Sequence, residues 1–386
     1  MRPAIPILCG CALFALTGLV IGQDQGPLPQ PGQTVAKPKK APGSGTSTDS
    51  GPAAAGAPTG PAEELPKIPS QYKKGKDVGD LPNFKTDVNV VTVDVSVVDN
   101  HGQFIPGIPA GNFRVLEDNT PQQIRKVEQG QAPMTIAMVV EFSQKFQGLY
   151  TYAWFQTQQL VWGFASTLKP EDFCAIIAYD IKPEILTDFT TDRQKIHEAL
   201  QRLTIPAWRE ANMFDAVTDA ADRMSGIEGR KAILLITSGI DTFSKITFDT
   251  ARKKLQESGV PVYSISLLGL QREMADAYMG PIQRMDFLQA DNELKTFARE
   301  TGGAAFFPKF EGEYPQMFQQ VQQALRSQYV ITYSPSNTKR DGTFRKIKVE
   351  LVDTNGKPLP VKDEKGKPIK YQILTKSGYK APHEVE

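Results

Sequence analysis

The chain has 386 residues, enough for two or three domains of ordinary size. Its 44 lysines and arginines balance 43 aspartates and glutamates, so net charge does not favour nucleic acid or an anionic membrane as the main partner. Hydrophobic residues make up 40% of the chain, which is enough for a folded core.

The amino terminus, residues 1–22, has the pattern of a signal peptide. Arg2 supplies the positive start, an apolar stretch runs from Ile7 to Ile21, and Gly22 offers a cleavage position. This stretch is short for a membrane span, which needs about 20 apolar residues. We therefore expect a secreted or periplasmic protein of the cell envelope with no membrane span after cleavage. An uncleaved anchor is the alternative.

Residues 23–83 form the next segment, which is rich in Pro, Gly, Ala, Ser, Thr and Lys and poor in apolar side chains. Such a composition buries too little surface to offset chain entropy, so it predicts a disordered linker. Cleavage before this segment would leave Cys174 as the only cysteine, which excludes an internal disulfide.

Two segments, on either side of the middle region, have the alternation of β-strands. In residues 84–132, the valines from Val91 to Val97 alternate with polar residues. Residues 327–382 contain similar alternating runs. Neither segment has enough strands to bury a core alone, so we expect the two to pair as one small β-sandwich.

The middle region, residues 133–326, alternates short apolar runs with amphipathic segments. Runs such as 136–140 and 232–236 are continuous, which is typical of strands buried on both faces of a parallel sheet. Right-handed crossovers would place the intervening helices on both faces. We therefore predict an α/β fold, a doubly wound and mostly parallel sheet inserted into the β-sandwich, with ligands at the carboxyl ends of its strands.

Three motifs follow one another in this region: a strand ending in VVEFS, a helix beginning near NMFDAV and a strand ending in LLITSGID. In this order they resemble the von Willebrand factor type A domain, whose sheet is Rossmann-like. Over residues 86–382 the order resembles more closely a bacterial secreted family related to that domain, of the acidobacterial type. The flanking patterns of that family match Val93 to Gln122, Tyr329 to Val349 and Gly378 to Pro382.

The resemblance implies a position for a metal ion, because metal-binding A domains hold a divalent ion with oxygens from three loops. These loops supply Asp-x-Ser-x-Ser, a Thr and an Asp. The corresponding residues here are Glu141, Ser143, Lys145, Ala211 and Ser238. Only Ser143 is unchanged, and the Lys145 ammonium would repel Mg²⁺. The resemblance therefore implies a degenerate metal-ion-dependent adhesion site with no bound metal or other cofactor.

Two points stay open at these loops. The Lys145 ammonium either approaches the vacated metal position and pairs with Glu141, or it points into solvent. Residual Mg²⁺ binding would use Glu141, Ser143 and Asp241. Asp215 is a further source of oxygen after a rearrangement, although the resemblance gives it a structural role in its helix.

The sequence has no motif for enzymatic chemistry. Its three histidines, His101, His197 and His383, lack the partners of a zinc or catalytic site, and no nucleophile elbow or phosphate-binding loop occurs. We expect an exported, non-enzymatic protein-binding or adhesion module. The alternatives are Mg²⁺-dependent adhesion and a purely structural envelope component, and an enzyme would need a different site.

The predicted partner-binding face lies at the loops of the implied metal site. It comprises Glu141, Ser143, Lys145, Ala211, Asn212, Ser238 and Asp241. A second candidate contact surface is the loop predicted at 270–286, which is longer than a typical connection. The aromatic segment 150–164 is predicted to be a helix that packs in the core. The pattern points to a protein partner but does not identify it or the oligomeric state.

Overall fold

The computed structural model describes residues 90–143, 150–203, 208–269, 272, 279–362 and 366–383, all within one compact unit. The predicted signal peptide at 1–22, the predicted linker at 23–83 and Lys145 lie outside the described residues. The boundaries predicted for the domains stay predictions.

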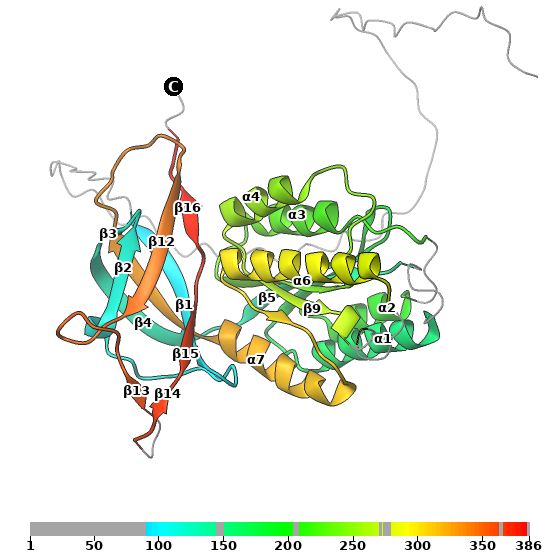
Figure 1. The fold of residues 1–386 in the computed structure, drawn as a ribbon, viewed down its shortest axis with the longest axis horizontal. Coiled ribbons are helices and arrows are strands. Elements are labelled where there is room, and N and C mark those ends of the chain that lie inside the picture. Colours follow the sequence, from blue (N-terminus) through cyan, green and yellow to red (C-terminus); the bar gives the residue numbers. More distant parts are fainter. Residues whose placement is uncertain are drawn as a thin grey trace, which may run out of the picture. The chain divides into compact units, whose positions relative to one another are not determined.

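The centre of the fold is a six-stranded sheet with the strand order β10-β9-β8-β5-β6-β7 (Figure 1). Its strands are β5 (Met134–Glu141), β6 (Phe173–Tyr179), β7 (Pro183–Thr190), β8 (Arg230–Thr237), β9 (Val262–Ser266) and β10 (Ala305–Phe306). Neighbouring strands are parallel, except for the antiparallel pair of β6 and β7. Every residue from Ile136 to Val140 in β5 is fully buried, as expected for a strand covered on both faces.

Helices cover both faces of this sheet. They are α1 (Tyr150–Ser166), α2 (Arg193–Gln201), α3 (Met213–Met224), α4 (Phe248–Ser258), α6 (Pro281–Thr301) and α7 (Tyr314–Arg326), with short 3₁₀ helices η1 (Ala110–Asn112) and η4 (Glu311–Glu313). Met138 of β5 packs in a core with α1, α2 and α7, whereas the adjacent Val139 packs with α3, α4 and α6. The doubly wound, mostly parallel α/β fold is therefore confirmed. No helix in the described ranges is long and apolar enough to cross a membrane.

Two predictions about helices have different outcomes. The aromatic segment 150–164 forms most of α1, and Leu160, Val161 and Phe164 are buried in the core, as predicted. The loop predicted at 270–286 is wrong in its second part, because α6 begins at Pro281. Proline is favoured in the first turn of a helix, where its missing N–H is not needed.

An antiparallel β-sandwich flanks the α/β domain. Its strands are β1 (Val91–Asp99), β2 (Phe113–Glu117), β3 (Thr120–Pro121), β4 (Gln123–Gln131), β11 (Ser327–Ser334), β12 (Phe344–Leu351), β15 (Tyr371–Leu374) and β16 (Gly378–Lys380), beside a small hairpin of β13 (Val361–Lys362) and β14 (Pro368–Ile369). The two sheets have the orders β15-β1-β11-β4 and β16-β12-β2-β3. Each sheet thus combines strands from before and after the α/β domain, which confirms the predicted insertion.

The inner faces of the two sandwich sheets share one core. Val93 of β1 and Ile331 of β11 pair across one sheet, and Val115 of β2 pairs with Val349 of β12 in the other. The Tyr333 hydroxyl donates to the buried Glu117 carboxylate (2.7 Å), across 216 residues of sequence. The sandwich therefore depends on contacts between the two ends of the described chain.

The strands of the central sheet begin beside the sandwich. Arg230, the first residue of β8, donates from Nη2 to the Gly130 carbonyl oxygen of β4 (2.5 Å) and from Nη1 to the Arg326 carbonyl oxygen. Arg326, at the end of α7, also forms a bidentate ion pair with the buried Asp172 before β6. The C-terminal ends of β5, β8 and β9 consequently lie at the opposite end of the sheet, away from the sandwich (Figure 1). We call this end the carboxyl edge.

Candidate functional site

Glu141 is the last residue of β5 and lies at the carboxyl edge of the sheet, with its side chain only 5% exposed. Its Oε1 accepts a hydrogen bond from the Ser143 hydroxyl (2.8 Å). Its Oε2 accepts from the Ser238 backbone N–H (2.7 Å) and from the Thr237 hydroxyl (2.9 Å). Both carboxylate oxygens are therefore bonded within the protein, and they join the loop after β5 to the loop after β8.

Tyr179 supports this carboxylate from the end of β6. Its hydroxyl donates to Thr237 Oγ1 (2.7 Å), and the Thr237 hydroxyl in turn donates to Glu141. Burial, together with the nearby charge of Glu141, raises the pKa of Tyr179 well above its ordinary value, so the phenol stays protonated at neutral pH. Sequence reasoning missed Tyr179 and Thr237, because each is a single polar group at the end of an apolar strand.

Ala211 and Asn212 precede α3 and are held mainly through their backbones. The Ala211 carbonyl oxygen accepts from the N–H groups of Thr242 (2.8 Å) and Phe243 (3.1 Å), while its own N–H donates to the Thr242 hydroxyl (2.9 Å). The Asn212 N–H donates to the Asp180 carbonyl oxygen (2.8 Å). The loops after β6 and β8 are therefore tied to the start of α3.

Asp241 and Asp215 link the loop after β8 to α3 by hydrogen bonds: Asp241 of the loop accepts from α3, and Asp215 of α3 accepts from the loop. Asp241 Oδ1 accepts from the Phe214 backbone N–H (3.2 Å) and the Ser244 hydroxyl (2.5 Å), and Asp215 Oδ2 accepts from the Lys245 N–H (3.0 Å). Burial raises the pKa of Asp241, although the bonds from Ser244 and Phe214 oppose this effect. Both carboxylates hold the loop in place, so Asp215 acts between α3 and this loop, whereas the resemblance implies a structural role within its helix.

Residues 137–240, from β5 to the loop after β8, match the family model of the von Willebrand factor type A domain. Over these residues the chain matches a von Willebrand factor type A domain, and we call the whole α/β unit around the six-stranded sheet the A domain. The match includes Glu141, Ala211 and Ser238, on which the comparison with the metal-binding loops rests. The narrower likeness to the acidobacterial type stays a prediction. No curated protein matches the chain.

Several solved structures are similar to part of the chain. Proximal thread matrix protein 1 from the mussel byssus is 11% identical, with 51% of this chain and 49% of that chain covered and a TM-score of 0.39. The vWF domain of the type V pili tip protein Mfa5 from Porphyromonas gingivalis is 13% identical, with coverages of 50% and 97% and a TM-score of 0.37. BatB from Bacteroides thetaiotaomicron is 14% identical, with coverages of 50% and 98% and a TM-score of 0.37. The chain spans about half the length of the mussel protein.

Among the described residues at this end of the sheet, the acidic oxygens that Mg²⁺ would need are bonded within the protein. That ion demands near-octahedral oxygen ligands and keeps several waters. Both oxygens of Glu141 are bonded within the protein, Asp241 is bonded to α3, and Ala211 has no side-chain oxygen. In the described part of the chain, no group of three or more His, Cys, Asp or Glu side chains could hold a metal ion.

The structure brings six of the seven predicted face residues together at this edge, whereas Lys145 lies outside the described residues. Four of the six are buried: Glu141, Ala211, Asn212 and Ser238. Ser143 and Asp241 are half-buried. The four buried residues position the loops, and their side chains are not exposed to a protein partner. That the seven residues form a partner-binding face stays a prediction.

The A domain also has exposed apolar side chains at this edge, which we call the apolar rim. Its members are each more than half exposed: Trp208, Phe243, Ile282, Met285 and Leu288. Trp208 precedes α3, Phe243 follows β8, and the other three lie in the first turns of α6. A cavity of about 330 Å³, lined by Asp241 and Asp286 among others, places the start of α6 beside the loop after β8.

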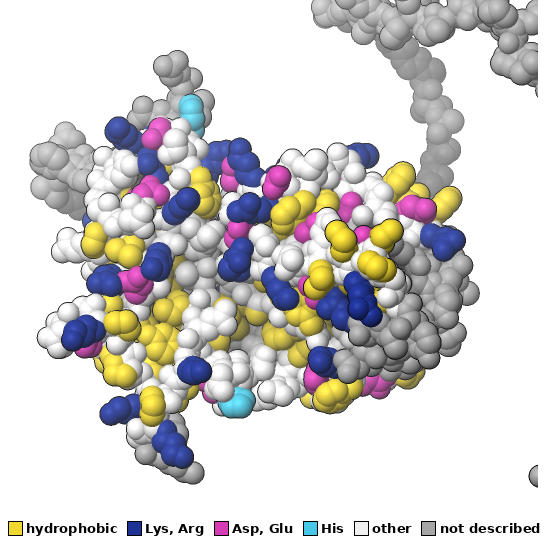
Figure 2. Space-filling view, in the orientation of Figure 1, with side chains coloured by type: hydrophobic (Ala, Val, Ile, Leu, Met, Phe, Trp, Pro, Cys, Tyr) yellow, Lys and Arg dark blue, Asp and Glu magenta, His cyan; other side chains and the backbone are white. Residues whose placement is uncertain are grey.

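Figure 2 shows hydrophobic side chains gathered at the end of the A domain that lies away from the sandwich. Sequence reasoning found part of this surface, since the segment 270–286 includes Ile282 and Met285. It missed Trp208 and Phe243. Phe243 is a large apolar residue between polar neighbours, and that isolation is the signal that could have identified it, whereas Trp208 directly follows the apolar residues 205–207 and gives no such signal.

Proposed function

We propose that this chain is an exported, non-enzymatic protein-binding or adhesion module whose A domain binds its partner without a metal ion. The observation that carries the proposal is the bonding of Glu141, whose two carboxylate oxygens accept hydrogen bonds from Ser143, Thr237 and Ser238. A hydrogen bond to a charged group is worth about 1.5–3 kcal/mol. A metal ion would have to replace several such bonds, with few oxygen ligands to compensate.

The apolar rim supplies the contact surface in this proposal. Large exposed apolar side chains that gather on one surface mark interaction sites, and aromatic anchors dominate many protein interfaces. Phe243 extends from the loop that is bonded to Ala211, and Ile282 and Met285 lie on the adjoining helix. Because the loop that carries Phe243 is held by hydrogen bonds, less conformational entropy of the loop is lost when a partner binds the apolar rim.

Export is supported by the signal-peptide pattern of residues 1–22. The absence of enzymatic chemistry is supported by the state of the potential nucleophile Cys174. Burial raises the pKa of that thiol to about 12, so it is protonated and unreactive at neutral pH.

A binding experiment with envelope extract tests the proposal. The chain without residues 1–22 is immobilised, and captured proteins are compared with and without EDTA and between wild type, Phe243→Ser and Met285→Ser. The control is Phe173→Ser, because Phe173 is also exposed but lies at the start of β6, on the opposite edge of the sheet. We expect the rim variants to lose a partner that wild type and control retain, with no effect of EDTA. Loss of the partner on chelation, or equal capture by the rim variants, contradicts the proposal.

A further inference from the structure

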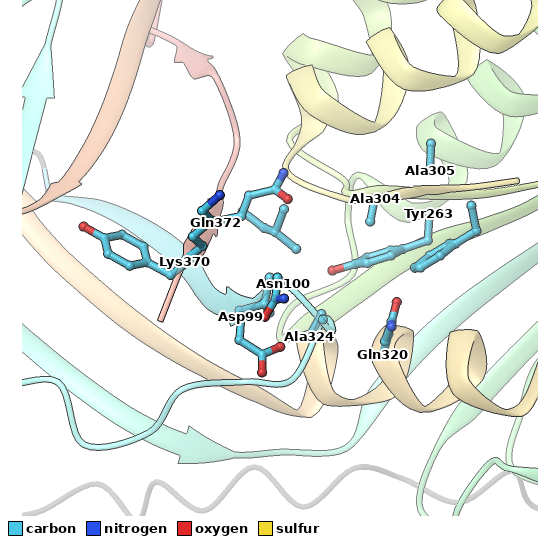
Figure 3. Close-up of a pocket in the computed structure, with 14 residues that line it drawn as sticks. Asp99, Asn100, Tyr263, Ala304, Ala305, Gln320, Ala324, Lys370 and Gln372 are labelled. Carbon is cyan, nitrogen blue, oxygen red and sulfur yellow. The ribbon is translucent and has the colours of Figure 1, made fainter. Parts of the chain in front are cut away.

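A second cavity, of about 440 Å³, lies where the A domain meets the sandwich (Figure 3). Its lining comes from the turn after β1, from β9 and β10, from α7 and from β15. The floor of the cavity consists of buried residues, namely Val98, Tyr263, Ala324 and Leu374. Its mouth has three exposed residues, Asn100, Lys370 and Gln372. The volume is within the range of small-molecule sites, about 300–1,000 Å³.

Tyr263 places an unpaired hydroxyl at this cavity. Its side chain is only 1% exposed, and the hydroxyl points into the cavity (Figure 3). Three other fully buried tyrosines, Tyr179, Tyr329 and Tyr333, each donate a hydrogen bond to another group of the protein. Tyr263 has no such bond within the described residues, and burial alone raises its pKa. Because the hydroxyl faces the cavity and is not bonded within the described residues, it is available to donate to a bound molecule that offers an oxygen.

The rest of the lining is rich in uncharged hydrogen-bonding groups. The carboxamides of Asn100 and Gln372 each offer a donor and an acceptor, and that of Gln320 offers its oxygen, because its Nε2 already donates to the His101 carbonyl oxygen. Charges are balanced, since one lysine, Lys370, lines the cavity together with one aspartate, Asp99. Asp99 Oδ1 is also occupied, because it accepts from the backbone N–H groups of His101 and Gln103. The cavity therefore suits a neutral ligand with many hydroxyl groups.

We propose that this cavity binds a neutral saccharide of one or two sugar rings. A sugar ring has apolar faces that match the floor of Val98 and Leu374, and hydroxyl groups that match the phenol and the three carboxamides. An extended peptide fits less well. It would have to pair with the sheet edges beside the cavity, where β10 has only 2 residues and β15 only 4. The cavity lies at the N-terminal end of β9, and the apolar rim lies at the other end of the strands. The test of saccharide binding is therefore independent of the proposed protein binding.

The test measures saccharide binding to the whole chain without residues 1–22, by saturation-transfer NMR and calorimetry. The probes are glucose, galactose, mannose, N-acetylglucosamine and their β-1,4-linked dimers, with trialanine as the peptide probe. We expect at least one saccharide to bind, and Tyr263→Phe to weaken its binding about tenfold through loss of one hydrogen bond. Gln372→Ala, at the mouth of the cavity, is expected to weaken saccharide binding as well.

The matched control is Tyr329→Phe, which removes a hydroxyl that bonds the Ile105 carbonyl oxygen and lies outside the cavity. That variant is expected to lower the melting temperature and to keep wild-type saccharide binding. Tyr263→Phe is expected to keep the melting temperature, because no hydrogen bond within the described residues is lost. The proposal is overturned if no saccharide binds at about 10 mM, if Tyr263→Phe binds as wild type does, or if only trialanine binds.

Discussion

Asp172 and Arg326 form a buried, bidentate ion pair that joins the start of β6 to the end of α7. The Asp172 side chain is fully buried and also accepts a hydrogen bond from the Met134 N–H (3.2 Å). The pair therefore connects three segments at the point where the chain leaves the A domain for the sandwich.

Removal of one partner of this ion pair is expected to be strongly destabilising. Arg326→Met leaves the Asp172 carboxylate buried without its cation, so the free energy of unfolding should fall by about 3–5 kcal/mol. The double variant Asp172→Leu with Arg326→Met should lose less than the sum of the two single variants. Urea unfolding of the four proteins gives the coupling energy, and additive losses contradict the prediction.

Acid should weaken the fold through the same pair. Burial acts to raise the pKa of Asp172, but hydrogen bonds from Arg326 and from the N–H groups of Lys169 and Met134 outweigh it and bring the pKa below 3.8. A carboxyl group with a lowered pKa in the folded state stabilises above its unfolded pKa, and this contribution is lost as pH falls through the folded pKa. We expect the free energy of unfolding to decline below about pH 4, and less steeply in Asp172→Asn. Parallel declines in the two proteins would refute the assignment.

Glu141 should matter for stability as a hydrogen-bond acceptor. Glu141→Ala leaves the Ser238 N–H without its acceptor and should lower the free energy of unfolding by about 2–4 kcal/mol. Glu141→Gln keeps an oxygen for Ser238 and offers an amide donor to the Ser143 hydroxyl, so about 1 kcal/mol is expected. Chemical denaturation measures both values. Equal losses in the two variants would show that the carboxylate charge, which both remove, decides, and not the hydrogen bonds that Gln can still form.

Addition of Mg²⁺ should not stabilise the wild-type protein. A ligand that binds only the folded state raises the melting temperature, so the metal-free site that we propose predicts no rise. The variant with Glu141→Asp, Lys145→Ser, Ala211→Thr and Ser238→Asp restores the oxygen groups of the metal-binding pattern. Its melting temperature should rise with millimolar Mg²⁺, provided that it folds without metal, which circular dichroism establishes first. A rise in the wild type would contradict the metal-free proposal.

The fold could be predicted from the sequence because its main determinants are periodic. Continuous apolar runs such as 136–140 require burial on both faces, and the flanking strands cannot bury a core unless they pair. The positions that correspond to the metal-binding loops came from the resemblance and stay a prediction. The bonds that hold Glu141 could not be predicted, because Thr237 and Tyr179 reach it only once three strands are aligned. The burial of Ala211 and the cavity at Tyr263 likewise depend on packing between distant segments, which no local pattern specifies.

The bond between Glu117 and Tyr333 spans 216 residues, and that separation has a consequence for how the chain folds. Closing a flexible loop of that length costs about 5 kcal/mol of chain entropy. A folded A domain shortens this loop, because β5 begins and α7 ends close together at the Arg230 contacts. The A domain should therefore fold first and bring the two halves of the sandwich together. Until β11, β12 and β15 have been synthesised, β1 and β2 have unpaired edges, which is the state most open to misassembly and proteolysis.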